Sequence, residues 1–437
     1  MKYLDISKKT LSFVQGDQVE VLVTAHDSAL TRFANSYIHQ NVKETNCHVT
    51  VRVIRDNKQG FAETNSFEID ALKAVAQKAG EISDFSPKDP VQRILPGKSD
   101  YKQLDLPDLA TISITPEQRA EAVKGMIDYA NPLGLTIAGA YSNDHSYTAI
   151  ANSNGIEAES EGAGANLKVT AMSTDSSGAA EVETPHVSEI NPMMIIKEAC
   201  DRAITSKNPI AIDPGEYEVV LLHYAAAELV GMMNWSGYSA RSAEEGSCWT
   251  QFHMGKQIFS DKFTVFDDPF DPRGGQRAFD YEGFPAHKMT LINAGVPVTL
   301  VFDSYYATKT GKNNTGHATP ASGGWGPFPM NIVVQGGNVS IDEMISKVKR
   351  GVLISRFWYS NLIRPLEIEF TGMTRDGLFL IEDGKIKAGL KNMRVTDSII
   401  RILSGLIECE NVTRSHDGII CPAMHCKSIK FSSGTLF

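Results

Sequence analysis

Residues 350–403 read RGVLISRFWYSNLIRPLEIEFTGMTRDGLFLIEDGKIKAGLKNMRVTDSIIRIL, and this stretch says most about the fold. Its β-branched and aromatic residues fall in short runs, with Asp376-Gly377 and Asp383-Gly384 between them. Asp-Gly between two such runs is a strong signal for a tight hairpin turn. The stretch therefore predicts antiparallel strands joined by short turns, with one helix over residues 342–350 before them.

The sequence upstream of this stretch predicts more β-structure and one long helix. Residues 218–222 read as a buried strand and residues 224–235 as a helix. Residues 256–338 are rich in glycine, proline and aspartate, which indicates short strands linked by long loops. Asp213-Pro214-Gly215 marks a joint, so we expect a C-terminal, largely antiparallel β domain over residues 211–437.

The first 210 residues predict a mixed α/β region with helices on a sheet. Strand-like alternation covers residues 19–65, and Asp27-Ser28 and Asp56-Asn57 are its turn signals. Later elements follow in the order helix, strand, strand, helix: 116–129, 135–152, 155–172 and 192–204. A first helix is expected over residues 69–80, with Asp70 as N-cap and Gly80 as its end. A further boundary falls near residues 85–110, and the predicted fold class is α+β.

Composition excludes several classes of protein. The net charge is −10 without a basic stripe, which argues against direct nucleic-acid binding because phosphates need a cationic face. No run of about 18 apolar residues and no secretory signal occur, so no membrane association and a cytoplasmic location are expected. Six scattered cysteines do not form a disulfide framework.

Several motifs occur in one order along nearly the whole chain, and this order resembles the TldD/PmbA family. The detail is similar to the PmbA (TldE) branch. Such an ordered set is more specific than any single pattern. The motifs are the 350–403 stretch, TRFANSYIHQ (31–40), GYSARS (237–242), DDP (267–269), FDYEG (279–283), DSY (303–305), TGHA (315–318) and FSSGT (431–435).

The resemblance implies a two-part subunit that forms a dimer, either with itself or with a TldD-like subunit. It also implies a metallopeptidase (hydrolase) system in which TldD and TldE act together on unfolded or extended peptides, with zinc in the TldD-like subunit. The family has also been labelled a modulator of DNA gyrase. Proteolysis is therefore the activity that the resemblance suggests.

The motif at the position of the family's zinc site is degenerate. Where a zinc-binding member reads His-Glu-x-x-x-His, this chain reads His223-Tyr224-Ala225-Ala226-Ala227-Glu228. His223 keeps the first ligand, but Tyr224 stands in for the general base, and a tyrosine with a pKa near 10 is a poor base at neutral pH. Glu228 stands in for the second histidine, and residues five apart lie about 140° apart around a helix. Three interpretations remain: a buried strand end at His223 with Glu228 facing solvent or capping a turn, an atypical metal site at His223 and Glu228, or a different catalytic role for these residues.

Three other groups of residues merit attention. His317, in Thr-Gly-His-Ala, is a candidate for substrate binding or for an interface, or a hydrogen-bonded loop histidine. Cys421 and Cys426, with His416 upstream, match no zinc-knuckle spacing. The aromatic run 357–359 predicts that the dimer interface draws on the C-terminal domain, because aromatic residues concentrate at interface cores.

We therefore predict a PmbA/TldE-like subunit of a TldD/TldE-type metallopeptidase system. It lacks its own zinc and catalytic residues and contributes peptide binding to a partner's proteolysis, so whether it is itself an enzyme stays open. No cofactor is expected, apart from zinc if the site survives or zinc held by a TldD-like partner. The alternatives are a self-contained metal-dependent peptidase with an atypical site and a non-catalytic peptide-binding scaffold.

Overall fold

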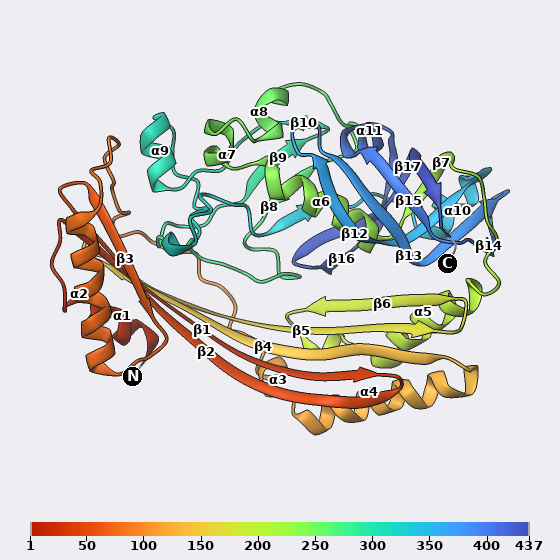
Figure 1. The fold of residues 1–437 in the computed structure, drawn as a ribbon, viewed down its shortest axis with the longest axis horizontal. Helices are drawn as coiled ribbons and strands as arrows, with labels where there is room; N and C mark the ends of the chain where they lie inside the picture. The colour runs from red at the N-terminus through yellow and green to blue at the C-terminus, as the bar shows by residue number, and fades with distance from the viewer. Residues whose placement is uncertain (1, 436–437) are drawn as a thin grey trace.

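The N-terminal region is built on one sheet and the C-terminal region on another (Figure 1). The computed structural model describes residues 2–435. The α+β class is confirmed, with helices on an antiparallel sheet first and a mostly antiparallel β region after it. The N-terminal elements are α1 (Tyr3–Leu11), β1 (Gln18–Ala34), β2 (Tyr37–Arg55), β3 (Lys58–Thr64), α2 (Ile69–Phe85), α3 (Leu109–Ser113), α4 (Pro116–Ala130), β4 (Thr136–Asn152), β5 (Glu157–Met172), β6 (Ser177–Thr184) and α5 (Pro192–Thr205).

The N-terminal sheet has six antiparallel strands in the order β3-β2-β1-β4-β5-β6. The hairpin turn between β1 and β2 lies at Asn35-Ser36, where both residues have positive φ. The expected turn at Asp27-Ser28 is wrong, because Asp27 pairs with both neighbouring strands and its carboxylate accepts a hydrogen bond from Thr45 Oγ1 at 2.6 Å. The turn expected at Asp56-Asn57 is confirmed between β2 and β3.

The N-terminal region consists of the same supersecondary unit twice, although the sequence shows no repeat. Both α1–β1–β2–β3–α2 and α4–β4–β5–β6–α5 run helix, three strands, helix, and β1 pairs with β4 at the centre. A glycine in the third strand of each unit marks the same contact. A Cβ on Gly60 would lie 2.2 Å from Ala79 O of α2, and one on Gly178 would lie 2.3 Å from Ala199 O of α5. Each glycine therefore lets its following helix contact the strand backbone.

Helix α2 differs from its predicted bounds. Its N-cap is Glu68 and not Asp70, and the helix continues past Gly80 to Phe85. Gly80 does not end the helix, because Arg55 packs over it and donates a hydrogen bond to its carbonyl oxygen at 3.3 Å. In contrast, Thr115 caps α4 as expected, through a capping box with Gln118.

Among residues 2–435, sixteen further helices and strands follow β7 in the C-terminal region. Its elements are β7 (Gly215–Leu221), α6 (His223–Gly237), α7 (Ala240–Glu244), α8 (Trp249–His253), β8 (Val265–Asp267), β9 (Met289–Asn293), β10 (Val296–Pro297), α9 (Ser304–Thr310), β11 (Ile332–Val334), α10 (Ile341–Lys347), β12 (Arg350–Arg364), β13 (Glu369–Glu382), β14 (Lys385–Gly389), β15 (Met393–Ser398), α11 (Ile399–Ser404), β16 (Leu406–His416) and β17 (Ile419–Gly434). The glycine-rich stretch 256–338 forms long loops with short strands, as expected, and adds the unexpected helix α9.

Five strands of the C-terminal region close into a ring. The order β17-β15-β13-β12-β7 is completed by pairing of β7 with β17, and β7 runs parallel to β12. Apolar side chains of these strands and of α6 form the largest core of the molecule. Asp383-Gly384 makes the expected turn between β13 and β14. The hairpin expected at Asp376-Gly377 is wrong, because both residues lie inside β13, where their positive φ angles accommodate an irregularity of pairing with β12.

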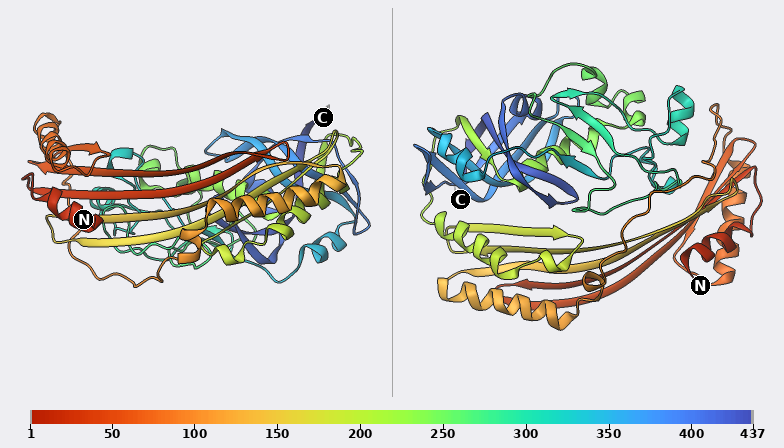
Figure 2. Two further views of the ribbon diagram at one scale, coloured as in Figure 1. Left: turned by 90° about the horizontal axis from the view of Figure 1, so that it is seen from below. Right: turned by 180° about the vertical axis from the view of Figure 1, so that it is seen from behind.

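The C-terminal region lies over one face of the long sheet, and α4 and α5 lie on the other (Figures 1 and 2). A buried cluster of charge joins the two regions at one end. Arg52 of β2 contacts Glu20 Oε2 of β1 at 2.8 Å and Glu282 Oε1 of the C-terminal region at 3.0 Å. Asp280 and Asp303 lie beside it, and we call these five residues the Arg52 cluster.

Two acids of the Arg52 cluster have raised pKa values. Burial, reinforced by the Glu282 charge, raises the pKa of Asp280 to about 8 and that of Asp303 to about 7. Asp280 accepts hydrogen bonds from the amides of Glu282, Phe284 and Ala318.

Within residues 2–435, no helix is long and apolar enough to cross a membrane.

Candidate functional site

The degenerate motif lies at the start of α6, directly after the buried strand β7. His223 is the first residue of this helix, so the expectation that it ends a strand is wrong by one element. Its side chain is 2% exposed, and its ring centroid lies 3.7 Å from that of Tyr224. Nε2 of His223 has no hydrogen-bond partner among the described residues.

Tyr224 has a structural role at the position of the general base. Its hydroxyl accepts a hydrogen bond from the Glu181 amide at 2.8 Å and donates one to the Glu181 carbonyl oxygen at 3.0 Å. Glu181 lies on β6, an edge strand of the six-stranded sheet, whose free N–H and C=O groups need partners. Burial raises the pKa of the Tyr224 hydroxyl. The phenol therefore stays protonated and ties α6 to the sheet.

Glu228 lies one and a half helical turns further along and points elsewhere. It is partly buried and lines a cavity of about 380 Å³ with Arg356, His416 and Trp358. Glu228 neither faces solvent nor caps a turn, so the expectation of one of these two roles is corrected. Burial raises the pKa of its carboxyl, and the neighbouring groups Ser360, His416 and Arg356 only partly offset this.

Two arginines flank His223. Burial lowers the pKa of His223 well below its usual value, and the charges of Arg414 and Arg202 lower it further. The imidazole is therefore neutral, as a metal ligand must be, yet two cations beside it repel a metal ion. Arg414 comes from β16 and contacts Glu198 Oε2 of α5 at 3.4 Å.

A second group of ionisable residues lies beyond Tyr224 and includes the ligand set best suited to a metal by distance. Within residues 2–435, ligand atoms of Glu181, His416 and Asp417 lie within 4.8 Å of one another. His416 Nδ1 and Lys168 Nζ each lie 3.2 Å from Glu181 Oε2, and Asn166 donates to Oε1 at 2.8 Å. We call Glu181, Lys168 and His416 the His416 cluster.

The His416 cluster joins the six-stranded sheet to the C-terminal region through opposite charges. Burial alone would raise the pKa of the Glu181 carboxyl, but the charge of His416 at 3.2 Å, with the Lys168 charge, lowers it to about 2. Burial alone would lower the pKa of His416, but the Glu181 charge raises it. Glu181 is thus ionised near neutral pH and the same contact favours the protonated form of His416, an arrangement that suits an ion pair better than a ligand set for zinc.

The residues present fit zinc poorly. His223 and Glu228 diverge around α6, and neither belongs to the Glu181, His416 and Asp417 group. The Lys168 ammonium occupies the Glu181 oxygen that a metal would need. The buried thiols also offer no thiolate: burial raises the pKa of Cys200 to about 11 and that of Cys409 to about 12.

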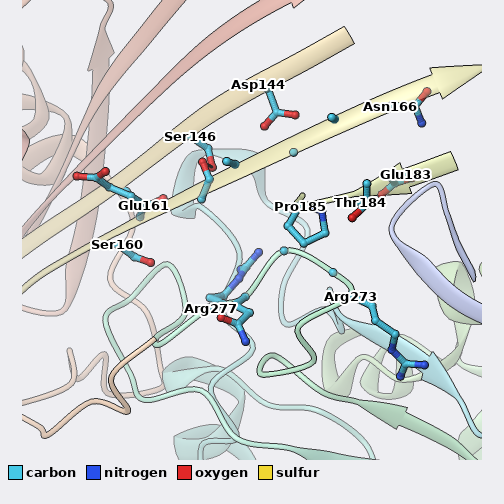
Figure 3. Close-up of a pocket in the computed structure, with 18 of the residues that line it drawn as sticks. Asp144, Ser146, Ser160, Glu161, Asn166, Glu183, Thr184, Pro185, Arg273 and Arg277 are labelled. Atoms are coloured by element: carbon cyan, nitrogen blue, oxygen red, sulfur yellow. Dashed lines mark hydrogen bonds between the residues drawn. The ribbon is translucent and has the colours of Figure 1, made fainter. Parts of the chain in front are cut away.

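A larger cavity system follows the seam between the two regions. One cavity of about 400 Å³ has Asp144 and Ser146 of β4 and Glu161 of β5 on one side and Arg273 and Arg277 of the 273–281 loop on the other (Figure 3). Gly162 and Gly164 of β5 leave space there, because they present no side chain. Burial raises the pKa of Asp144. Acidic groups on the sheet thus lie across an open space from Arg277, whereas the Arg273 guanidinium points away and pairs with Asp271 (Figure 3).

His317 is a loop histidine with both ring nitrogens engaged. It is 2% exposed, with Nε2 at 2.8 Å from Asp267 Oδ2 and Nδ1 at 2.9 Å from Thr315 Oγ1. These contacts attach the 315–317 loop to β8. A substrate-binding role for His317 stays a prediction, and binding through either nitrogen would require one of these contacts to break.

Sequence reasoning missed the partners that decide the chemistry of this site. Glu181 and Lys168 lie on neighbouring strands, and His416 approaches them from the β16–β17 hairpin. His416 attracted notice only as a neighbour of Cys421, which is buried in the core instead. A signal did exist: Lys168 and Glu181 interrupt otherwise small or apolar strand positions, which is where a buried or functional charge stands out.

Comparisons with known proteins cover the chain in three parts. Family models described as PmbA/TldA metallopeptidase domain 1, central domain and C-terminal domain match residues 19–83, 111–207 and 214–433. The metalloprotease PmbA of Escherichia coli O157:H7 is 20% identical over 443 residues, which cover 95% of this chain and 92% of the relative. A TldD homolog of Buchnera aphidicola, also called a metalloprotease, is 24% identical and covers 85% and 83%.

Solved structures share the fold. TldE from Thermococcus kodakarensis superimposes with a TM-score of 0.89 at 20% identity, covering 98% of this chain and 99% of that one. A proposed modulator of a DNA gyrase from Thermotoga maritima gives a TM-score of 0.87 at 20% identity, covering 95% and 96%. At such identities the likeness establishes the architecture of the whole chain, whereas the site must be judged from its own residues.

Proposed function

Because the chain belongs to the PmbA/TldD metallopeptidase family, we propose that it acts there as a TldE-like subunit without hydrolytic activity of its own. In this role it binds extended peptide and completes the substrate site of a TldD-like partner. The observation that carries the proposal is the start of α6. Tyr224 holds the edge of β6 where a base would stand, and Arg202 and Arg414 flank the remaining histidine.

Peptide binding is supported by the open seam between the two regions. Cavities of about 400 and 380 Å³ follow one side of the six-stranded sheet, each within the size range of ligand sites. Backbone and charged groups line both of them. An unfolded segment lying in the seam would contact both regions of this chain at once. These contacts would hold the segment for hydrolysis at the site of a partner subunit.

The proposal is tested by co-expression with a TldD-like protein from the same genome. A stable complex with peptidase activity is expected, and that activity should persist when this chain carries His223→Ala. Elemental analysis of this chain purified alone should find far less than one zinc per chain. Full activity of the partner without this chain, or no association of the two, would refute the proposal.

A self-contained metallopeptidase is the alternative, and the unpartnered Nε2 of His223 is the observation in its favour. Tyr224→Glu with Glu228→His restores the residue types of the motif, and adding Arg414→Ala removes a flanking cation. We expect weak metal binding at most from the double variant, because orientation by surrounding groups commonly changes metal affinity about 10–100-fold. Chelator-sensitive proteolysis by the unmodified chain would favour the alternative instead.

A further inference from the structure

A third cavity, larger than the two described above, lies at the end of the seam beyond the Glu228 cavity. Its volume is about 1010 Å³, and it shares Trp358 and Tyr359 with that cavity. Its walls come from the β5–β6 turn on one side and from β12, β13 and the 390–394 segment on the other. A space of this size matches the upper end of ligand sites, about 300–1,000 Å³, and holds several residues of extended chain.

Positive charge without a counter-charge collects in this groove. Arg375, Lys391 and Arg394 line it, and none of the three has a carboxylate within 4.0 Å among residues 2–435. Two carboxylates, Asp175 and Asp376, line the same groove, so its cations outnumber them three to two. Asp376 binds Arg356 through Oδ2, and Asp175 accepts hydrogen bonds from Asn208 N and Ser173 Oγ. The groove therefore presents net positive potential although the whole chain carries −10.

The strand pairing adds a like-charge contact that calls for an anion. Arg356 and Arg375 are direct cross-strand partners on β12 and β13. Like charges in that position destabilise a sheet unless they are compensated, and Asp376 compensates only Arg356. The Arg375 guanidinium instead lies 4.5 Å from the centroid of the Trp358 ring. It is held in place without being neutralised.

Two exposed aromatic side chains stand beside these cations. Trp358 is 45% exposed and Tyr359 is 80% exposed. Tyr359 has φ of 57°, a left-handed conformation that is strained for a residue with a side chain. Such strain concentrates at ligand sites, and here it directs a tyrosine into the groove that it lines. Aromatic rings of this kind contact peptide backbone and side chains at little entropic cost.

We propose that this groove binds an extended peptide segment rich in aspartate or glutamate. The acidic side chains pair with Arg375, Lys391 and Arg394, and the peptide backbone crosses Trp358 and Tyr359. From there the segment continues past Tyr359 towards the Glu228 cavity. The inference rests on the proposed function in that it names the class of segment delivered to the partner, but the groove belongs to this chain alone.

The test measures binding of three fluorescein-labelled nonapeptides to the purified full chain by anisotropy. They alternate alanine with glutamate, glutamine or lysine. We expect the glutamate peptide to bind at low salt and weaken in 0.5 M NaCl, because salt screens exposed charge. The glutamine and lysine peptides should bind at least about tenfold more weakly. Equal binding of the lysine peptide would overturn the proposal.

Charge-reversal variants test whether the peptide binds in this groove. Arg375→Glu with Arg394→Glu should weaken glutamate-peptide binding about tenfold or more, whereas Lys385→Glu, an exposed control on β14, should change it less than about twofold. Trp358→Ala should also weaken binding without changing its salt dependence. Unchanged binding by the double reversal would overturn the proposal, and so would equal competition by a single-stranded oligonucleotide of the same charge.

Two further outcomes separate this inference from the proposed function. Association with a TldD-like partner but no preference for the glutamate peptide would overturn the groove and leave the subunit role. Preference for the glutamate peptide without association would do the reverse. Sedimentation of the Arg375→Glu, Arg394→Glu variant measures its oligomeric state. A changed oligomeric state with unchanged peptide binding would mean that the groove contacts a second copy of the chain, and this result would overturn the proposal.

Discussion

The Arg52 cluster and the His416 cluster both join the long sheet to the C-terminal region, and they are built on opposite principles. In the Arg52 cluster, one cation contacts two of four neighbouring carboxyls. In the His416 cluster, two cations serve one carboxylate, and Lys168 is 42% exposed. Burial, with the Glu282 charge, raises acid pKa values in the first, whereas the cations of the second lower one to about 2. The comparison shows that a single interface can respond to rising and to falling pH.

The largest expected effect breaks the first cluster. Arg52→Met leaves Glu20 and Glu282 buried without a counter-charge, which typically costs about 3–5 kcal/mol. Urea unfolding at pH 7 measures the loss. Lys8→Met is the matched control, because Lys8 and Glu157 form an exposed pair at 2.7 Å worth about 0–1 kcal/mol. Equal losses in the two variants would show that burial does not distinguish the clusters.

Asp303→Asn sharpens the comparison through pH. The pKa of Asp303 is about 7 in the folded chain, against an ordinary value of 3.8, so its stabilising contribution is full below about 3.8 and is lost as pH rises through 7. Asparagine keeps the N-cap of α9 without the charge. Wild type should therefore lose on the order of 2 kcal/mol more than the variant between pH 4 and 8, as measured by unfolding at each pH.

The control for that substitution has the opposite sign. Asp108 is also an N-cap, on α3, but hydrogen bonding from the Thr111 hydroxyl lowers its pKa. Its contribution is present above 3.8 and is lost as pH falls, so Asp108→Asn should leave the slope between pH 4 and 8 unchanged. The same flattening in both variants would contradict our account of Asp303.

Much of the fold followed from local pattern, and the exceptions share one cause. The capping box at Thr115 and the turn at Asp56-Asn57 depend on neighbours a few residues away, which a sequence displays. Asp27 and Asp376 look like turn residues in isolation, yet pairing with strands far along the chain keeps both inside strands. Contacts across the molecule decided these two positions.

The site shows the same division. The motif His223-Tyr224 could be recognised from order alone, because its residues are consecutive. That Tyr224 would hold Glu181, 43 residues upstream, or that Arg52 would meet Glu282, 230 residues downstream, could not be predicted. Both contacts depend on how the two regions dock, and no local periodicity encodes that.

Tyr224→Phe is expected to have an intermediate effect. Deleting the hydroxyl leaves the amide and carbonyl of Glu181 without their buried partner, which costs about 1–3 kcal/mol. Thermal or urea unfolding measures the loss, and hydrogen exchange at the Glu181 amide should become faster. Tyr217→Phe removes a hydroxyl that bonds Asp213 O at the surface and should cost clearly less. If the two costs are alike, Tyr224 does not hold the sheet edge.

The smallest effect concerns His416→Gln. The folded pKa of His416 is raised, so its contribution is full below 6.5 and disappears as pH rises above that folded pKa. The variant should lose about 1 kcal/mol or less near pH 6 and almost nothing at pH 9. His186→Gln serves as control, since His186 is half exposed and 3.9 Å from Asp108. A constant loss at every pH would mean that packing, and not charge, holds this junction.

The two clusters lie far apart on one stiff support. Glu20 and Arg32 are on the same strand, and the pairings Arg32–Ala140, Ala140–Lys168 and Lys168–Glu181 place Arg32 in line with the His416 cluster. Twelve residues of β1 at about 3.3 Å each separate them by about 40 Å. In mechanical terms the C-terminal region is attached to the sheet at two distant points, so it cannot rotate about one of them while the other is intact. If the contacts at the His416 end, where Lys168 is 42% exposed, were broken while the Arg52 cluster held, a rotation about the Arg52 cluster would displace the distant end of the C-terminal region more than the near end.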